Sequence, residues 1–344
     1  MTTPPCLDWR PAMLAECLED KIAVVVIGHN EGERLSRCLR SVWASDWPAE
    51  KLDVIYVDSA STDDSCFRAR SEGARVFAST QPGAAAARNT GWRVSHAQWI
   101  MFLDGDTVLD PHFLRNALKI LQKDESCACI WGHRRELAPH QSCYVRVLDL
   151  DWCYQSGDTL FCGGDALFRR SALLDAGGYD ATIMAGEEPE LCYRLRCNGW
   201  RIRHINAAMT LHDLAISSFS QYWQRAVRAG YAYAAVSRHT GALWQSEVRH
   251  SLRQAGLLLL VPLLSLVLLT WGSAALLPWL ALCLLMLRSA WRARWRSQDT
   301  VTLLLYGIHS WFEQLPVCCG IWRCWHDQRQ RVGQRLINYK RSPS

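Results

Sequence analysis

The sequence predicts an α/β fold with a mostly parallel sheet, followed by helices that associate with a membrane. Two observations predict the sheet. Short apolar runs alternate with amphipathic helical segments over the first two hundred residues, and most of these runs end in polar or acidic loops. One further observation predicts the membrane segment: no charged residue occurs between Ala255 and Leu287. A chain of 344 residues has room for one large or two modest domains.

Four apolar runs are expected to form the first strands of the sheet. The first, residues 22–27, is a continuous run of aliphatic residues that breaks at Gly28. A helix is expected next, because Leu35, Cys38, Leu39 and Val42 recur at helical spacing. The other early strands are expected at residues 54–57, 74–77 and 99–103, with helices at 83–91 and 113–121 and later strands at 128–132, after 164 and at 200–205. Residues 137–160 are expected to be irregular or helical.

The run at residues 99–103 stops at two carboxylates, Asp104 and Asp106, with Gly105 between them. Buried acids are costly unless something pairs with them. At the carboxyl end of a strand in an α/β sheet, that partner is often a cation and its phosphate ligand. A plain turn remains the alternative interpretation of this tripeptide.

The charge is divided unevenly along the chain. From Glu247 onward there are 12 Lys and Arg against 4 Asp and Glu, whereas the preceding part has 26 against 29. The basic residues therefore accompany the most apolar segment, which favours an anionic membrane surface over nucleic acid as the partner. The 15 cysteines are scattered without the spacing of a zinc site, and we interpret them as reduced thiols. Many of the 17 tryptophans cluster after Trp271, as in an interfacial belt.

The uncharged segment is expected to form a hairpin of two short spans or a re-entrant pair. Pro262, the pair Gly272-Ser273 and Pro278 interrupt it, and arginines flank both of its ends. Because both basic flanks favour the cytoplasm, an even number of crossings is expected. Residues 301–325 form a third apolar segment, which we expect to be interfacial or re-entrant, and the basic tail is expected to lie on headgroups.

Five motifs, taken in their order, carry a resemblance to a known family. They are Val-Val-Val-Ile-Gly-His-Asn-Glu (24–31), Val-Asp-Ser-Ala-Ser-Thr-Asp (57–63), Gly-Ala-Ala-Ala-Ala-Arg-Asn-Thr-Gly (83–91), Leu-Asp-Gly-Asp (103–106) and Gly-Glu-Glu-Pro-Glu-Leu (186–191). Over residues 21–215 the chain resembles family 2 glycosyltransferases of the GT-A fold. The resemblance implies a Rossmann-like catalytic domain, a nucleotide-diphospho-sugar donor, Mg²⁺ or Mn²⁺ as cofactor, and inversion at the anomeric carbon.

The resemblance also implies roles for individual residues. Asp106 would bind the metal with His212, although a histidine after a strand is often structural. Glu188 would be the base for the acceptor hydroxyl; the family usually has Asp there, so Glu187 could act instead. Asp104 would contact the donor and assist catalysis. The remaining donor-side residues are Asn30, Glu31, Asp58, Ser59, Arg88 and Gly105, and the acceptor-side residues are Gly164, Asp165 and Glu190. A structural salt bridge is the alternative role of Arg88, a tight turn that of Gly164, and helix capping that of the glutamates.

Processive synthases of this family carry a Gln-x-x-Arg-Trp signature after the catalytic core. The corresponding stretch here begins at Gln221, lacks the Trp after Arg225 and is off by one in spacing. We therefore expect transfer of a single sugar to a lipid-linked or glycan acceptor in cell-envelope or exopolysaccharide synthesis, at the cytoplasmic face of the inner membrane. A polyprenyl-phosphate glycosyltransferase and an inactive membrane scaffold of the same fold are the alternatives. The expected segments are 1–20 (lead-in), 21–215 (catalytic), 216–254 (interfacial helices), 255–325 (transmembrane or re-entrant helices) and 326–344 (tail).

Overall fold

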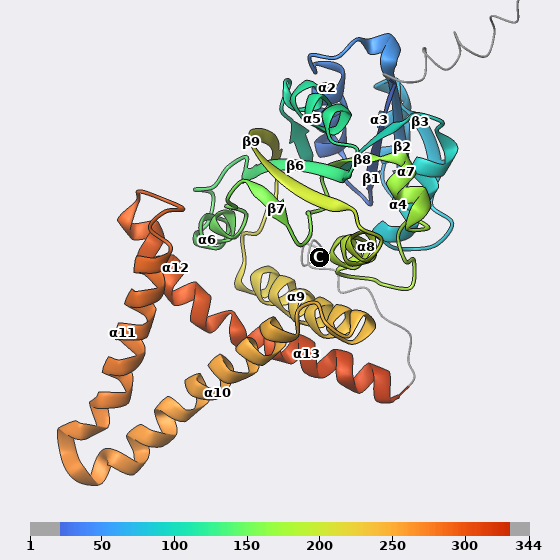
Figure 1. Cartoon of the computed structure of the whole chain (residues 1–344). Helices are drawn as coiled ribbons and strands as arrows, with labels where there is room; N and C mark the ends of the chain where they lie inside the picture. The colour runs from blue at the N-terminus through green and yellow to red at the C-terminus, as the bar shows by residue number, and fades with distance from the viewer. Residues whose placement is uncertain (1–20, 331–344) are drawn as a thin grey trace, which may run out of the picture. The chain divides into compact units, whose positions relative to one another are not determined.

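The structure, a computed structural model, describes residues 21–330 of the chain (Figure 1). The expected lead-in and most of the expected tail lie outside the described residues. The chain divides into two compact units. The sheet unit comprises residues 21–133, 156–181 and 194–210, and the helical unit comprises residues 134–155, 182–193 and 211 onward.

A mixed sheet forms the core of the fold. Its first four strands in space are parallel, because β1 pairs with β2 and β4, and β2 pairs with β3, in parallel register. β8 then pairs antiparallel with both β4 and β6, and β7 pairs antiparallel with β9. The order is β3-β2-β1-β4-β8-β6-β9-β5, with β7 beside β9. The strands are β1 (Ile22–Gly28), β2 (Leu52–Asp58), β3 (Arg75–Ala78), β4 (Trp99–Asp104), β5 (Thr107–Leu109), β6 (Cys127–Glu136), β7 (Gly157–Thr159), β8 (Ala166–Arg169) and β9 (Arg201–His212).

The sheet confirms the predicted α/β fold and explains the apolar runs. Ile22 through Val26 of β1 are completely buried, as are Ile100 through Leu103 of β4. Strands covered on both faces carry such continuous apolar runs rather than an alternating pattern. Two short strands, β5 and β7, were not predicted, and β9 continues to His212, well past the predicted end at residue 205. Within residues 137–160, the structure forms α6 and β7.

The strand β3 ends the sheet on one side. It is only four residues long and none of its residues is buried. Arg75 lies over the ring of Phe77 and pairs with Asp53, with 2.9 Å between Nη1 and Oδ1. A short edge strand with a charged side chain is a poor template for further strand pairing.

Helices connect the strands and build the helical unit. In the sheet unit, α4 lies directly against β1: a Cβ on Gly91 would stand 2.2 Å from Val25 Cγ1. The helices up to residue 197 are α2 (Glu33–Trp43), α3 (Ser65–Ser71), α4 (Ala84–Val94), α5 (Phe113–Lys123), α6 (Cys143–Asp151), α7 (Arg170–Asp175) and α8 (Glu187–Cys197), with a 3-10 turn at Ala49–Lys51. Those that follow are α9 (Phe219–Thr240), α10 (Gln245–Leu268), the 3-10 segment η2 (Leu269–Leu276), α11 (Leu277–Arg292), α12 (Thr300–Phe312) and α13 (Gln314–Arg329).

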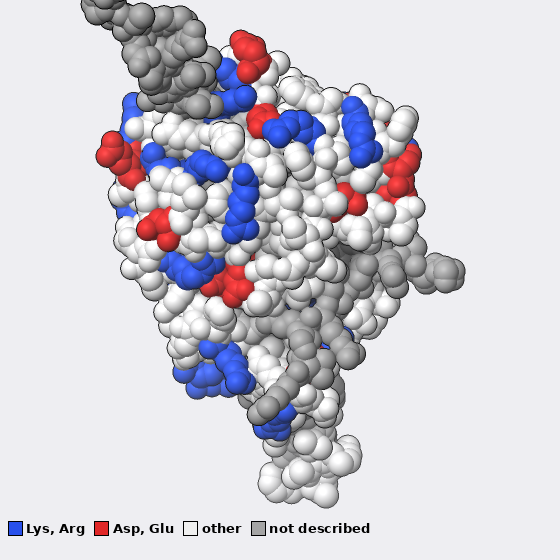
Figure 2. Space-filling view, turned by 90° about the vertical axis from the view of Figure 1, so that its right-hand side faces the viewer, with Lys and Arg blue, Asp and Glu red and all other residues white. Residues whose placement is uncertain are grey.

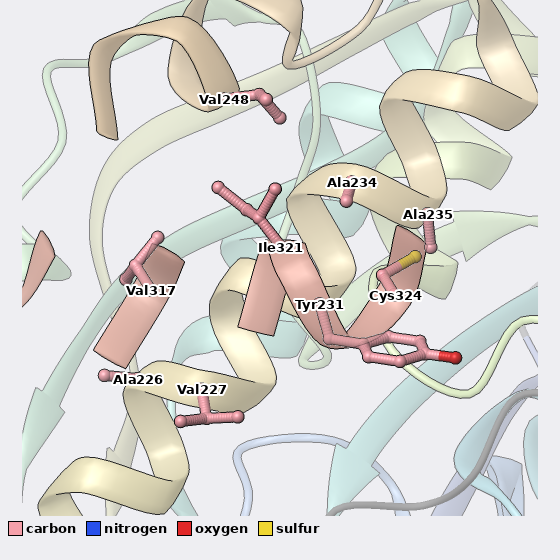
Figure 3. Close-up of a cluster of buried hydrophobic side chains, with 9 residues drawn as sticks. All are labelled: Ala226, Val227, Tyr231, Ala234, Ala235, Val248, Val317, Ile321 and Cys324. Atoms are coloured by element: carbon pink, nitrogen blue, oxygen red, sulfur yellow. The ribbon is translucent and has the colours of Figure 1, made fainter. Parts of the chain in front are cut away.

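The helices α9 and α13 are in close backbone contact. A Cβ on Gly230 would lie 1.9 Å from the carbonyl oxygen of Val317, and one on Gly320 would lie 2.0 Å from that of Val227. Glycine on both helices therefore lets their backbones touch, the arrangement that small residues permit at helix interfaces. A buried apolar cluster surrounds the crossing (Figure 3), formed by Ala226, Val227, Tyr231, Ala234, Ala235, Val248, Val317, Ile321 and Cys324.

The helices α10 and α11 form a hairpin. Trp271 and Gly272 have non-helical dihedral angles, and the chain reverses there. Leu258 of α10 and Leu282 of α11 belong to one apolar cluster. The whole segment Gln245–Arg292 is long and apolar enough to enter a membrane, with a mean hydropathy of 2.2 in its best window. The predicted interruption at Gly272-Ser273 thus coincides with the observed turn, whereas the apolar segment at 301–325 is divided between α12 and α13.

Candidate functional site

The loops after β1 and β2 are joined by hydrogen bonds. The Asn30 backbone N–H donates to Ser61 Oγ at 2.9 Å, and Asn30 Oδ1 accepts from the Thr62 backbone at 2.7 Å. His29 Nδ1 lies 2.8 Å from the carbonyl oxygen of Ser59. Asn30 and Ala60 have positive φ angles, so both loops make tight reversals. The expected donor residues Asn30 and Ser59 therefore lie at one end of the parallel strands, where α/β sheets usually bind ligands.

Asp58 closes β2 as a buried carboxylate. Its Oδ1 accepts from Tyr56 Oη at 2.9 Å, and its Oδ2 accepts from the Ser61 backbone at 2.9 Å. Burial raises the pKa of Asp58, but the hydrogen bonds from Ser61 and Tyr56 outweigh it and hold this pKa below its usual range. Asp58 is therefore ionised at neutral pH.

Glu31 and Gly105 belong to the same end of the sheet. Glu31 is 7% exposed and pairs with Arg34, with 2.9 Å between Oε2 and Nη2. The Gly105 backbone donates to the carbonyl oxygen of Ile27 at 2.8 Å, and a Cβ on Gly105 would meet Glu31 Cγ at 3.1 Å. Glycine at this position lets the loop after β4 lie against the loop after β1.

Asp104 is fixed through both its backbone and its side chain. Its N–H donates to Asp165 Oδ1 at 3.0 Å, and its Oδ1 accepts from Arg88 Nη2 at 2.9 Å. Arg88 is 2% exposed and also lies over the ring of Tyr179. The Asp104 side chain is 28% exposed, so the Arg88 guanidinium orients a carboxylate that solvent can still reach. The structure thus contains the salt bridge that was the alternative role for Arg88.

Asp165 connects strands that are far apart in sequence. It is completely buried, and its Oδ2 accepts from Thr210 Oγ1 of β9 at 2.8 Å. Its two oxygens therefore tie the end of β4 to β9. The acceptor-side role implied for Asp165 stays a prediction, while its hydrogen bonds give it a positioning role.

Gly164 borders the Arg88–Asp104 pair. A Cβ there would stand 2.6 Å from Arg88 Nη2 and 3.0 Å from Asp104 Oδ2. Glycine therefore leaves the space beside this carboxylate that a side chain would fill.

Replacing Gly164 by alanine is expected to displace the Arg88–Asp104 pair, because the buried guanidinium has little room to retreat. The protein should lose roughly 1–3 kcal/mol of unfolding free energy, the usual range for overpacking. Thermal unfolding measures this loss. Gly256→Ala is the control, since a Cβ on Gly256 meets no atom within 4 Å. Equal melting temperatures for the two variants would show that a side chain at position 164 does not disturb the Arg88–Asp104 pair.

Asp106 lies in a region of concentrated negative charge. It is 2% exposed. Burial, together with the nearby carboxylates of Asp165, Asp106 and Asp104, raises the pKa of the Cys38 thiol well above its usual value. Carboxylate oxygens are the ligands that Mg²⁺ and Mn²⁺ prefer, so this donor set fits a divalent cation.

His212, in the helical unit, is oriented by a carboxylate. It is 3% exposed, its Nδ1 lies 3.1 Å from Glu136 Oε1, and its ring meets that of Trp152 edge-on. A carboxylate on Nδ1 holds the proton on that nitrogen, so Nε2 carries the lone pair. Metal-binding histidines are typically held in this way. Glu136 is 76 positions away in the chain and belongs to no motif, so the sequence did not point to it.

The three glutamates at the start of α8 differ in exposure. Glu187 and Glu190 are 4% and 1% exposed, whereas Glu188 is half-buried. Glu190 Oε1 lies 3.6 Å from His239 Nε2. Gly186, with φ 87°, precedes them, and a Cβ there would meet Val236 at 2.6 Å. Among these three acids, Glu188 is the most exposed to solvent. Its proximity to Asp104 and Asp106, which the resemblance implies, stays a prediction.

Gln221 has a structural role at the start of α9. Its Oε1 accepts from the Ser218 backbone at 3.1 Å, and Ser218 Oγ accepts from the Gln221 backbone at 3.3 Å. This reciprocal pair is a capping box. The glutamine that corresponds to the first position of the processive-synthase signature therefore caps a helix here.

A second group of metal-ligating residue types, which the sequence did not reveal, lies in the helical unit. His309 Nε2 is 3.3 Å from Asp151 Oδ2 and 3.2 Å from Glu313 Oε2, and its Nδ1 is 2.7 Å from Tyr222 Oη. Tyr306 Oη donates to Asp151 Oδ1 at 2.9 Å. Both ring nitrogens of His309 therefore already contact protein side chains. We interpret the group as an ionic network that holds α6, α9 and α12 together.

Comparisons with known proteins show which family and fold the chain is similar to. Residues 23–175 match the model of glycosyl transferase family 2. The chain is 24% identical over 238 residues to poly-beta-1,6-N-acetyl-D-glucosamine synthase of Staphylococcus aureus strain COL, covering 64% of this chain and 56% of that protein. It is 27% identical over 218 residues to cellulose synthase 2 of Novacetimonas hansenii, covering 58% of this chain and 14% of that protein. The chain thus spans about half the length, or less, of these relatives.

Among solved structures, a mannosyltransferase from Pyrobaculum calidifontis in complex with GDP-Man and Mn²⁺ matches with a TM-score of 0.61. The match covers 90% of this chain and 88% of that one, at 19% identity. The fold is therefore that of the GT-A class, with helices after the sheet. The match to glycosyl transferase family 2 covers residues 23–175, which lie within this fold.

Proposed function

We propose that the chain is an inverting glycosyltransferase that moves a single sugar from a nucleotide-diphospho-sugar to a membrane-associated acceptor. The observation that carries this proposal is the end of β4, where Arg88 and Asp165 orient Asp104 next to the buried Asp106. Carboxylates held in this way at the ends of parallel strands suit the binding of a donor diphosphate with its cation. The acceptor would be lipid-linked or a glycan, in cell-envelope or exopolysaccharide synthesis.

Asp106 and His212 are the residues that would hold Mg²⁺ or Mn²⁺, and Asp104 would contact the donor. The metal, when bound, would supply positive charge for the diphosphate leaving group. Glu136 supports this assignment, because its contact with Nδ1 orients the His212 ring for ligation through Nε2. Asn30, Glu31, Asp58 and Ser59 would form the nucleotide side of the site.

Glu188 is our candidate for the base that takes the acceptor hydroxyl proton. Its greater exposure favours it over Glu187, which is buried, and Glu190, which lies close to His239. A base for this step needs access to the acceptor and a carboxylate that is ionised before transfer. The apolar hairpin, with arginines at both of its ends, and the capping role of Gln221 favour transfer of one sugar at the inner membrane, on the cytoplasmic side, over chain extension.

The first test identifies the donor and acceptor. Membranes from cells with and without the protein are incubated with a panel of nucleotide sugars, with and without Mn²⁺, and their lipids are compared by mass spectrometry. We expect one glycolipid, heavier by one sugar, only where the protein and the metal are both present. Donor binding without any transfer or hydrolysis would instead favour an inactive scaffold.

Glu188→Gln then tests the base. Transfer to a hydroxyl acceptor should fall by about 10²–10⁴-fold, the usual contribution of a general base, with donor affinity unchanged. Glu125→Gln is the control, because Glu125 is an exposed glutamate outside the site. If Glu188→Gln keeps most of its activity and the product is a polyprenyl-phosphate sugar, the acceptor is a phosphate, which needs little base.

A further inference from the structure

The apolar surface of the hairpin α10–η2–α11 is continuous and exposed. Trp271 at the turn is 74% exposed, and Leu266 and Val267 beside it are 65% and 70% exposed. A contiguous exposed apolar surface of this kind marks a site that binds another apolar phase. The other exposed apolar side chains on the two arms are Leu257, Leu259, Leu260, Leu263, Leu264, Leu269, Leu276, Leu277, Trp279, Leu280, Leu284 and Leu287.

The two arms of the hairpin run back along each other. Ser265 Oγ donates to the carbonyl oxygen of Ala275 at 2.7 Å, so these two residues lie at the same level on either side of the turn. Leu258 and Leu282 share a cluster farther from the turn. Arg253 and Arg288, the nearest charged residues on each arm, therefore lie at the same end of the hairpin.

The open end carries basic and aromatic side chains together. Arg294 lies over the ring of Trp291, with 3.9 Å from Cζ to the ring centroid, and Arg296 lies over that of Trp295 at 5.1 Å. Arginine and tryptophan in combination suit the headgroup region of an anionic bilayer. On the face shown in Figure 2, blue basic side chains lie above a lower projection that has neither blue nor red residues.

Each arm is slightly short for a bilayer crossing. Counted from its charged end to the turn, one arm has the uncharged residues 255–271 and the other has residues 272–287, which are about 27 Å and about 26 Å long at 1.5 Å per residue in the α-helices and 2.0 Å in the 3-10 segment. The hydrocarbon core of a bilayer is about 30 Å thick. The turn at Trp271 would therefore lie within the hydrocarbon if the arginines lie at the headgroups.

Two backbone carbonyl groups beside the turn accept hydrogen bonds from side-chain hydroxyls. Besides the bond from Ser265, Thr270 Oγ1 donates to the carbonyl oxygen of Val267 at 3.3 Å. A broken helix in hydrocarbon is tolerated only when side chains or neighbours satisfy the freed backbone groups. The hydroxyls of Ser265 and Thr270 supply such bonds to the carbonyl groups of Ala275 and Val267.

We propose that this hairpin inserts into the hydrocarbon core of an anionic bilayer and returns to the same side without crossing it. The proposal rests on the membrane association in the proposed function but is independent of sugar transfer. In this arrangement the arginines at the two ends of the hairpin, Arg253 and Arg288, lie on the same face of the membrane. A lipid-linked acceptor would then be reached from that same face of the membrane.

Depth-dependent quenching tests the proposal. The full chain, with a fluorescent unnatural amino acid in place of Trp271, is bound to vesicles of neutral and anionic phospholipid. Nitroxides at acyl carbon 12 should quench this probe most, whereas iodide added outside or trapped inside should not quench it. The same probe in place of Trp295, which is 50% exposed beside Arg294 and Arg296, is the control and should respond to headgroup nitroxides and to outer iodide.

Each alternative has its own signature in this experiment. Quenching of the Trp271 probe by trapped iodide would show that the turn crosses the bilayer, and quenching by outer iodide alone would show that it stays in water. Insensitivity to every quencher would show that protein, such as a second copy of the hairpin, covers the turn. Any of these three results overturns the proposal, whatever the transfer assay gives.

A charge placed at the turn provides a second readout. Ser273→Lys should weaken vesicle binding by about 10²-fold, because a lysine at the centre of a bilayer is disfavoured by about 2.5–3.5 kcal/mol on insertion scales. Gln298→Lys, at an exposed position outside the hairpin, should leave binding unchanged or strengthen it on anionic lipid. Equal binding of the two variants in flotation assays would contradict insertion of the turn.

Discussion

Asp106→Asn is expected to abolish sugar transfer, lowering kcat/KM by at least about 10³-fold. The substitution removes a charged oxygen ligand from the proposed metal site, and charge stabilisation by a metal contributes several kcal/mol to such a reaction. Folding should not suffer. Asp106 is 2% exposed near Asp104 and Asp165, so a neutral side chain of equal size relieves repulsion between carboxylates.

Three measurements on Asp106→Asn separate a catalytic defect from a structural one. Activity should be lost, Mn²⁺ affinity should fall, and the melting temperature should stay the same or rise. Asp110→Asn is the control: Asp110 is partly exposed and accepts a hydrogen bond from the His112 backbone at 2.9 Å, and its replacement should leave Mn²⁺ affinity unchanged. Wild-type activity in Asp106→Asn would remove this residue from the site.

Gly230→Ala is expected to cause the largest loss of stability in the helical unit. The added Cβ would lie 1.9 Å from the carbonyl oxygen of Val317, which is backbone and cannot rotate away. The helices α9 and α13 would have to separate, which would open the cluster around Tyr231 and Ile321 (Figure 3). We expect a loss of about 3 kcal/mol or more in unfolding free energy.

Denaturant unfolding in detergent measures the effect of Gly230→Ala. Gly256→Ala is a matched helical control, because its Cβ would meet no atom within 4 Å. That control should be neutral or should gain up to about 1 kcal/mol from helix propensity. Gly320→Ala should resemble Gly230→Ala, since its Cβ would lie 2.0 Å from the carbonyl oxygen of Val227. Similar stability in all three variants would show that α9 and α13 are not in backbone contact.

The sequence was sufficient for those parts of the fold that depend on local pattern. The continuous apolar runs that became β1 and β4 indicated buried strands, and their polar ends indicated the ligand-binding edge. Glycine likewise indicated where the apolar segment turns, because the chain reverses at Gly272, whereas the interruption expected at Pro262 was wrong, since Pro262 lies inside α10. Such features are encoded within a few neighbouring residues, so a single sequence can reveal them.

Contacts between distant residues could not be predicted in this way. The orientation of His212 by Glu136 and the link from Asp165 to Thr210 join positions 76 and 45 residues apart, and no motif records either pair. The division of the apolar segment 301–325 into α12 and α13 also has no local signal in hydropathy. It coincides with Glu313, whose carboxylate is paired with His309.

The sheet ends at β3, and its outer edge affects how the protein behaves at high concentration. A longer edge strand without charges would offer its backbone groups to the edge of another molecule and promote fibrous aggregates. With four residues and the charged pair Arg75–Asp53, this edge resists such stacking. If the protein aggregates after extraction from the membrane into detergent-free buffer, the exposed leucines of the hairpin should be the cause. A mild detergent should then reverse the aggregation.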